Sequence, residues 1–329
     1  MGVTIYDIAG QLGISAATVS RVLNSRNDSL ISEATRARVI SAAKQMGYKP
    51  NTMARALVTG KTYNIALFAE DMQERTGPHF ARMLEAMEPK ARELGYRMVV
   101  CGELESVLSS GMVDGVVLLA SSHPKLTSKF DHIARIFVYS SPDIVTNSVC
   151  WNDLEGTCMA LDYLCSLGHR SIVGILGDIR PEMEEHSPKV VGFRRAMEKS
   201  GLHWRELIGT RSTDQFENGY LLTKELLADP GDVTALFARN DFIALGAMKA
   251  IMETGMSIPD DISIVGYNDT ILARCVYPGL TSVHTPIAEA GVIAVEHLIR
   301  SMEGNQEEFA GAILPISLAV RDSCAPPKK

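Results

Sequence analysis

The sequence lacks the patterns that mark most enzymes and metal sites. It contains no GxSxG, GxxxxGK[ST], HExxH or GxGxxG run, and its eight histidines are dispersed without ligand spacing. Its six cysteines form no CxxC pair and no cluster with histidine at zinc spacing. We therefore expect reduced cysteines, no metal, no cofactor and no catalytic residues, as in a cytoplasmic protein that is not an enzyme.

Long apolar runs are also missing. Runs such as Val116–Ala120 fall far short of the roughly 20 residues that a membrane-spanning helix needs. No basic segment followed by an apolar one opens the chain, so we expect neither a signal peptide nor a membrane partner. What is present is an ordinary globular composition, 46% hydrophobic and 22% charged over 329 residues, which is enough chain for two or three domains.

Charge is unevenly distributed along the chain. Residues 1–60 contain seven Lys and Arg against three acidic residues, a net charge of +4, whereas the whole chain carries −7. The remaining residues therefore carry a net charge of −11. A small basic segment ahead of an acidic body favours a polyanion as the partner of the basic segment alone.

The basic segment carries three helix signals. Thr4 can cap a first helix whose apolar residues follow helical spacing and which ends at Gly13. Serines can cap a second helix over residues 15–24 and a third over residues 32–46. Two short helices joined by a glycine turn and supported by a third are the pattern of a helix-turn-helix.

The outward side of the second helix favours a DNA-reading role. It carries small or hydrogen-bonding residues and Arg21, where a solvated helix more often carries Glu and Lys. Small side chains let a helix lie deep in a major groove, alanine can contact a thymine methyl group, and arginine can bind guanine or a phosphate. A solvated face that happens to be small is the alternative interpretation.

Two runs, "TIYDIAGQLGISAATVSRVLN" at 4–24 and "YKPNTMARAL" at 48–57, resemble the LacI/GalR family of bacterial transcriptional regulators. The resemblance implies a helix-turn-helix DNA-binding head over residues 1–49, a hinge helix or linker over 50–60, and an effector-binding and dimerisation domain over 61–329. The residues that we expect to contact DNA are Thr4, Ser15, Ala16, Ala17, Thr18, Ser20, Arg21, Asn24, Ser32, Thr35, Tyr48, Asn51, Ala54, Arg55 and Leu57.

The hinge is too short to form a stable helix alone in water and should fold only when something packs it. The resemblance implies that two hinge helices fold together in the DNA minor groove, where a leucine wedges between base pairs and kinks the duplex. Leu57 stands at that position, with Ala54 and Arg55 beside it. A plain interdomain linker is the alternative.

The body alternates strand-like and helix-like segments, which predicts parallel sheets built from strand–helix–strand units. Its length suits two lobes that face each other across a cleft, with a ligand where the carboxyl ends of the strands meet. Between Cys101 and Val113 there is room only for a shortened crossover helix of about two turns. The expected strands are 64–70, 97–102, 113–120, 135–140, 171–177, 234–239 and 261–269, and the expected helices are 78–94, 153–167, 189–200, 217–228, 241–255 and 286–303.

The body also resembles the effector domain of the family, most clearly in "ARNDFIALGAMKAIMETGMSIPDDISIVGYNDT" at 238–270. The implied fold class is α/β: an all-α helix-turn-helix head and hinge helix joined to a two-lobed, doubly wound parallel-sheet domain similar to periplasmic binding proteins. The near lobe, which follows the hinge in the chain, is expected to cover about 61–157 and 285–314. The far lobe is expected to cover about 158–284 and 315–329.

The sequence departs from the family pattern at the expected effector site. In sugar-responsive members an arginine and two aspartates bind ligand hydroxyl groups, and Lys189, Asn268 and Tyr139 stand at those places here. Two carboxylate acceptors are therefore replaced, and a planar bidentate donor becomes a point charge. Further residues expected at the effector site are Phe80, Asp214, Phe216 and Asn240.

These departures predict a site that lacks two negative charges and keeps one positive charge. We therefore expect an effector that is not a simple neutral hexose, such as an anionic or phosphorylated metabolite. A degenerate site, and a regulator controlled by a protein partner, are the alternatives. A solute-binding protein with a vestigial head is a further alternative, but it would need a signal peptide.

The resemblance implies a homodimeric repressor whose affinity for a palindromic double-stranded operator is controlled by the effector. We expect the body to dimerise through the helix at 78–94 in the near lobe and the "CVYPGL" loop at 275–280 in the far lobe. No leucine heptad follows the last expected strand, which predicts a dimer rather than a tetramer formed through the tail.

Overall fold

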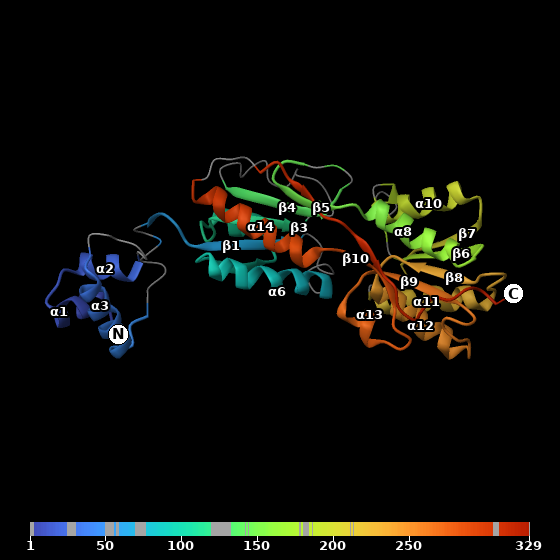
Figure 1. The fold of residues 1–329 in the computed structure, drawn as a ribbon, viewed down its shortest axis with the longest axis horizontal. Helices are drawn as coiled ribbons and strands as arrows, with labels where there is room; N and C mark the ends of the chain where they lie inside the picture. Colours follow the sequence, from blue (N-terminus) through green and yellow to red (C-terminus); the bar gives the residue numbers. More distant parts are fainter. Residues whose placement is uncertain are drawn as a thin grey trace. The chain divides into compact units, whose positions relative to one another are not determined.

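The chain folds into two units, residues 1–63 and 64–329, which we call the head and the body. Figure 1 draws both, coloured along the sequence. None of the helices in the described part of the chain is long and apolar enough to cross a bilayer. The computed structural model describes residues 3–24, 31–49, 56, 59–69, 77–119, 133–141, 143, 145–177, 179, 184–185, 187–210, 212, 214–304 and 309–328.

The head contains three helices, α1 (Ile5–Leu12), α2 (Ala16–Asn24) and α3 (Glu33–Gln45). The predicted caps are confirmed. Thr4 caps α1 in a capping box with Asp7, and Gly13 ends that helix with a φ of 62°. The hydroxyls of Ser15 and Ser32 accept the backbone N–H three residues further on, at the starts of α2 and α3.

The head has a small apolar core of its own. Ile8, Val19 and Val39, one from each helix, are fully buried at its centre. The remaining members of this core are small, and the alanines of α3 let the three helices approach one another closely. Because the inner side of α2 packs in this core, the position of its outer side is fixed.

The near lobe of the body is built on a parallel six-stranded sheet with the strand order β11-β5-β4-β3-β1-β2. Helix α14 (Ile287–Met302) packs on β3, β4 and β5 and against α6 (Pro78–Glu93), whereas the short α7 (Leu104–Ser109) packs on the opposite face. The strands are β1 (Asn64–Ala69), β2 (Arg97–Cys101), β3 (Gly115–Leu119), β4 (Ala134–Ser140), β5 (Ser148–Trp151) and β11 (Ala312–Ile313).

The far lobe is built on a second six-stranded sheet, with the strand order β12-β10-β9-β8-β6-β7, in which only β12 is antiparallel to its neighbour. Helices α8 and α10 cover one face and α11 and α12 the other. The strands are β6 (Ser171–Gly177), β7 (His203–Ile208), β8 (Ala235–Ala238), β9 (Ser263–Asn268), β10 (Thr281–His284) and β12 (Ser317–Ala319). The helices are α8 (Asp153–Ser166), α10 (Pro188–Ser200), α11 (Gln215–Ala228), α12 (Asp241–Glu253) and α13 (Ile271–Cys275).

The strand and helix ranges predicted for the body are present to within two residues at each end. The edge strands β7, β11 and β12 were not expected, and the last two are short. The crossover helix α7 has six residues, which agrees with the predicted short helix of about two turns. Helix α8 packs on α10 and on strands of the far sheet, so the chain enters the far lobe at about residue 152 rather than 157.

Candidate functional site

The edge of the far sheet where β6 and β8 end is a natural place for a site. Strands β7 and β8 flank β6 on opposite sides, and the helices α10 and α12 that follow β6 and β8 cover opposite faces. Open α/β sheets bind ligands at such a switch point, outside the carboxyl ends of the strands. Lys189 lies in the first turn of α10 and Asn240 caps α12, so both residues are at this edge.

Lys189 is the centre of a polar group at this edge. Its Nζ lies 3.2 Å from Asn268 Oδ1, 3.5 Å from the carbonyl oxygen of Arg239 and 3.9 Å from Asp153 Oδ2. The same ammonium lies 3.9 Å above the ring of Tyr267, which adds a cation–π contact. We call the following residues the interlobe cluster: His79, Arg82, Trp151, Asp153, Lys189, Tyr267 and Asn268.

Asp153 adds to this site one carboxylate that the sequence did not indicate, at a position other than those of Asn268 and Tyr139. It is buried at the start of α8, where its Oδ1 accepts the Trp151 indole N–H at 2.8 Å and the Tyr267 hydroxyl at 3.0 Å. Burial and the charge of Asp153 raise the pKa of Tyr267 well above its usual value, so this hydroxyl stays a donor. The acid was missed because an Asn-Asp pair before a helix is typical of an N-terminal cap.

The near lobe contributes His79 and Arg82 from the first turns of α6. The His79 ring meets the Trp151 ring edge to face, with centroids 6.1 Å apart. Burial, followed by the positive charges of Lys189 and Arg82, lowers the pKa of His79 to about 3. His79 is therefore neutral at physiological pH, and the charged side chains of the cluster are Arg82 and Lys189 against Asp153.

Phe80 does not join this cluster. Together with Met83, Met87 and Ala91 it forms the buried stripe of α6, at the spacing of three and four residues that places side chains on one helix face. His79 and Arg82 share a different face of the same helix. The apolar stripe is visible in the sequence and could have placed Phe80 in the core.

Three more of the predicted site residues have local roles. Asp214 and Asn240 cap α11 and α12, and the Asn240 amide also donates to Gln215 Oε1 at 2.7 Å. Phe216 faces Lys249 on the side of the α11–α12 pair that carries Tyr220. Of these three, Asn240 alone adjoins the interlobe cluster, because Lys189 binds the carbonyl of the residue before it.

Tyr139 also lies apart from the interlobe cluster. Burial raises its pKa, and its hydroxyl neighbours are Ser141 and Ser148. Adjacent residues of a strand point to opposite faces, and Ser140, the next residue of β4, instead accepts the backbone N–H of Asp153 at 3.1 Å. Tyr139 is thus on the predicted strand, and its neighbour Ser140 is the residue of β4 that contacts Asp153.

The head presents part of the predicted DNA-contacting set at its surface. Ala17 and Arg21, one turn apart on α2, are both exposed, as is Ser15 at its start. Ala16 instead packs partly against the head core, as does Tyr48. Thr18, Ser20 and Thr35 are half-buried, Thr4 and Ser32 are exposed caps, and Asn24 is the last residue of α2. Asn51, Ala54, Arg55 and Leu57 lie outside the described residues.

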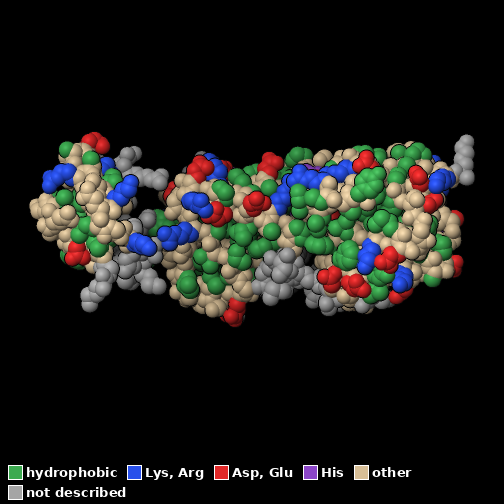
Figure 2. Space-filling view, turned by 90° about the horizontal axis from the view of Figure 1, so that it is seen from below, with side chains coloured by type: hydrophobic (Ala, Val, Ile, Leu, Met, Phe, Trp, Pro, Cys, Tyr) green, Lys and Arg blue, Asp and Glu red, His purple; other side chains and the backbone are tan. Residues whose placement is uncertain are grey.

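Tyr6 is a surface residue of the head that the sequence reasoning passed over. It lies on α1 with 73% of its surface exposed, although aromatic residues seldom stand so far out of a small domain. Figure 2 shows blue Lys and Arg side chains on the visible face of the head, and both signs of charge on the body.

The described residues contain no group of His, Cys, Asp and Glu side chains that could hold a metal ion. All six cysteines are free thiols, and Cys275 is the one that is exposed.

Comparisons with known proteins agree along the whole chain. Residues 4–51 match the family of bacterial regulatory proteins of the lacI type, and residues 161–324 match a periplasmic binding protein-like domain. The transcriptional regulator DegA of Bacillus subtilis is 34% identical over 99% of both chains. The transcriptional repressor PurR of Shigella sonnei is 30% identical over 93% of this chain and 92% of its own.

Solved structures show the same fold. A Lac repressor dimer bound to operator and an anti-inducer aligns with a TM-score of 0.82 and 26% identity, over 99% of this chain and all of the other. A complex of the transcriptional regulator CelR with cellobiose aligns with a TM-score of 0.67 and 28% identity over 98% of this chain and 99% of the other. The chain belongs to the LacI family of bacterial transcriptional regulators, with a helix-turn-helix head and a two-lobed body.

Proposed function

We propose that this chain is a repressor that binds a palindromic operator as a dimer and whose affinity for DNA is set by a small molecule bound in its body. The observation that supports it best is the outer side of α2, where Ala17 and Arg21 stand exposed one turn apart on a helix held by a packed core. That arrangement suits direct reading of base edges in a major groove.

Contacts with the phosphate backbone would come from the helix starts of the head. Thr4, Ser15 and Ser32 cap the three helices, and a helix N-terminus offers backbone N–H groups and a favourable dipole to an anion. Phosphate contacts fix the register of a protein on DNA, and the base contacts of α2 then select the sequence. The minor-groove role of Asn51, Ala54, Arg55 and Leu57 rests on the family resemblance alone.

Dimer formation is supported by apolar residues at the surface of the body. In the far lobe Tyr277 is 89% exposed, and Ile271 and Cys275 of the preceding helix α13 are also exposed. In the near lobe Val100 on the edge strand β2 and Met112 are exposed. Exposed apolar residues that gather at one place mark interaction surfaces, and the two-fold symmetry of a palindromic operator calls for a second copy of the chain.

The proposed effector site is the interlobe cluster. The body of an Enterococcus faecium regulator of this family was solved with bound ribose, at 26% identity, a TM-score of 0.69, and coverage of 80% of this chain and all of the other. For this chain we propose a small polar molecule that carries one negative group. Lys189 and Arg82 both lower the pKa of His79, which supports a positive potential there, and Asp153 offsets part of it.

Selection of bound sequences from a random pool of DNA tests the operator part of this proposal. We expect a palindromic consensus with two half-sites, because two heads would read it. A pool that shows no enrichment would contradict sequence-specific binding, and a single asymmetric site would contradict the dimer.

Calorimetry tests the effector part. We expect sugar phosphates or other small anions to bind more tightly than the matching neutral sugars, and Lys189→Met to remove that preference. Tight binding of an unphosphorylated neutral sugar, unaffected by Lys189→Met, would contradict the proposed class of effector.

A further inference from the structure

The turn that follows β9 holds two consecutive residues in the left-handed region of the backbone. Asn268 has a φ of 94° and Asp269 a φ of 47°. Asn and Asp tolerate this region better than other non-glycine residues, but the conformation still costs free energy and persists only where its surroundings hold it. The contacts around this turn therefore show what the fold holds in place.

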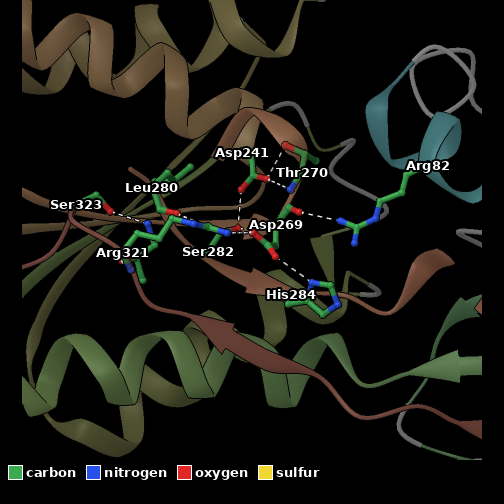
Figure 3. A network of polar contacts seen from close by, with 10 residues as sticks. Arg82, Asp241, Asp269, Thr270, Leu280, Ser282, His284, Arg321 and Ser323 are labelled. Carbon is green, nitrogen blue, oxygen red and sulfur yellow. Dashed lines mark hydrogen bonds and ion pairs between the residues drawn. The ribbon is translucent and has the colours of Figure 1, made fainter. Parts of the chain in front are cut away.

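Backbone groups of the turn are held by buried side chains of the far lobe. Ser282 Oγ accepts the Asp269 N–H at 3.0 Å. The Asp241 carboxylate accepts the Thr270 N–H at 2.6 Å, the Thr270 hydroxyl at 2.8 Å and the Ser282 hydroxyl at 2.6 Å. Figure 3 shows Asp241 and Ser282 converging on the turn from neighbouring elements.

The Asp269 side chain is held from the other side. Its carboxylate lies 3.0 Å from His284 Nδ1 and accepts a 2.6 Å hydrogen bond from Arg321, whose other amino group donates to the Leu280 carbonyl. Burial alone would raise the pKa of Asp269, but the hydrogen bonds from His284 and Arg321 outweigh it and lower the pKa. The carboxylate therefore stays ionised and keeps both partners.

Two contacts lead outward from this rigid turn. Asn268 Oδ1 accepts from Lys189 at 3.2 Å, inside the interlobe cluster. The carbonyl oxygen of Asp269 accepts from Arg82 Nη1 at 3.1 Å, and Arg82 belongs to α6 of the near lobe. One short turn thus contacts both Lys189 of the far lobe and Arg82 of the near lobe, two members of the interlobe cluster.

We propose that Arg82 and the Asn268–Asp269 turn form an interlobe latch, which holds the two lobes together and responds to what occupies Lys189 and Asn268. A molecule that competes for Lys189 or Asn268 removes one support of a conformation that is costly to keep. The Asp269 carbonyl then no longer meets Arg82 at the same angle, and the balance between closed and open bodies shifts. That this balance changes DNA affinity rests on the proposed function.

The latch can be tested without any ligand by using the two tryptophans of the chain. In full-length protein carrying Trp204→Phe, Trp151 is the remaining tryptophan, and it is 5% exposed beside His79 and Asp153. Acrylamide quenching of its fluorescence then reports how often the body opens. Hydrogen exchange of the Asp269 and Thr270 amides provides a second, independent measurement.

Arg82→Met keeps the aliphatic stem and removes the donor. A hydrogen bond from a charged donor contributes enough that we expect the ratio of closed to open bodies to fall about 10-fold. Quenching of Trp151 and exchange of the two amides should both increase. Arg82→Lys keeps a donor and should recover part of the difference. The matched control is Arg92→Met on the same helix, where the arginine is exposed and pairs with Glu88.

Equal quenching and exchange in the parent and in Arg82→Met would overturn the latch, and so would an equal effect of Arg92→Met. Thermal melting followed by circular dichroism establishes that each variant is folded. Selection of bound sequences from a random pool of DNA, with the same variants, is a separate measurement that tests the proposed function. Failure to select any DNA would contradict the proposed function and would leave the quenching result standing.

Discussion

At the scale of single residues, the choice of bases is expected to depend most on Arg21. Its exposed guanidinium can bind a guanine edge through two hydrogen bonds, which Ala17 one turn away cannot do. Arg21→Ala should weaken binding to the selected operator by about 1–3 kcal/mol and relax the preference at one position of each half-site. Titration of the operator and of single-base variants by fluorescence anisotropy measures both quantities.

Lys44→Ala is the control for Arg21→Ala, because it removes one positive charge from an exposed position near the end of α3. It should leave base preference unchanged and alter affinity by a similar factor on every sequence. A loss of affinity that is equal on all sequences for Arg21→Ala as well would mean that Arg21 binds phosphate and reads no base.

His79 leads to a prediction on pH. Its pKa in the folded body, about 3, lies below the ordinary value of 6.5, so between these values the unfolded chain binds a proton that the folded chain does not. The stability contributed by neutral His79 is complete above pH 6.5 and is lost as the pH falls toward 3. Between pH 7 and pH 5 the parent should lose about 1–2 kcal/mol more stability than His79→Gln.

Urea unfolding at the two pH values measures this difference. His203→Gln serves as the control, because His203 is exposed on β7 and its replacement should leave the acid sensitivity of the parent unchanged. If His79→Gln loses as much stability as the parent, the ring is not held neutral by its burial and by the charges of Lys189 and Arg82.

The residues of the effector site divide into those that the sequence predicted well and those that it did not. Lys189 and Asn268 meet because each stands at the end of a regular element whose position follows from the strand–helix alternation. Phe80 and Tyr139 were placed by motif position alone, which says nothing of the face on which a side chain lies. Asp153 was missed because it stands at a helix start, where an acid is typical, and its partners Tyr267 and Lys189 come from segments far apart in the chain.

At the scale of elements, α11 and α12 lie closer together than two ordinary helices. A Cβ on Gly246 of α12 would lie 2.0 Å from the Phe216 carbonyl oxygen and 2.7 Å from the Tyr220 nitrogen of α11. Backbone atoms cannot move aside as a flexible side chain can. Gly246→Ala should therefore destabilise the body by at least about 2 kcal/mol, measured by urea unfolding.

Gly10→Ala is expected to stabilise the protein, in contrast to Gly246→Ala. Gly10 lies within α1, and a Cβ there would meet nothing within 4 Å. Because alanine loses less conformational entropy than glycine in a helix, the head should gain about 0.5–1 kcal/mol. A Gly246→Ala protein as stable as the parent would show that α11 and α12 can separate without cost.

Helices and strands with a regular hydrophobic pattern were predicted from the sequence, whereas those without such a pattern were missed. The central strands β3, β6 and β9 are runs of buried, largely apolar residues, and this pattern belongs to buried parallel sheets. Strands β11 and β12 have only two and three residues and contain no buried residue, because they lie at sheet edges. The packing of the lobes determines how β11 and β12 pair, and a local sequence pattern cannot predict that packing.

At the scale of the whole molecule, the chain passes between the lobes after β5, after β10 and after β11. Because three segments of the chain join the two lobes, the lobes can tilt relative to each other while they stay side by side in the same alignment. The two-lobed architecture follows from the sequence pattern. The first crossing depends on α8, which packs with α10 across a close approach at Gly192.

Dimer formation depends on which surfaces the two lobes expose. Tyr277 is the residue with which to test it. A tyrosine exposed by 89% on the far lobe is expected to be buried against a second copy of the chain. Tyr277→Asp would bring a charge into that contact and should shift the protein from dimer to monomer in light scattering. Since a monomer binds one half-site at a time, affinity for a palindromic operator should fall by about 10²-fold or more. Met252→Asp, at another exposed apolar position on α12, is the control and should leave both the mass in light scattering and the operator affinity unchanged. A Tyr277→Asp protein that remains a dimer would place the interface elsewhere.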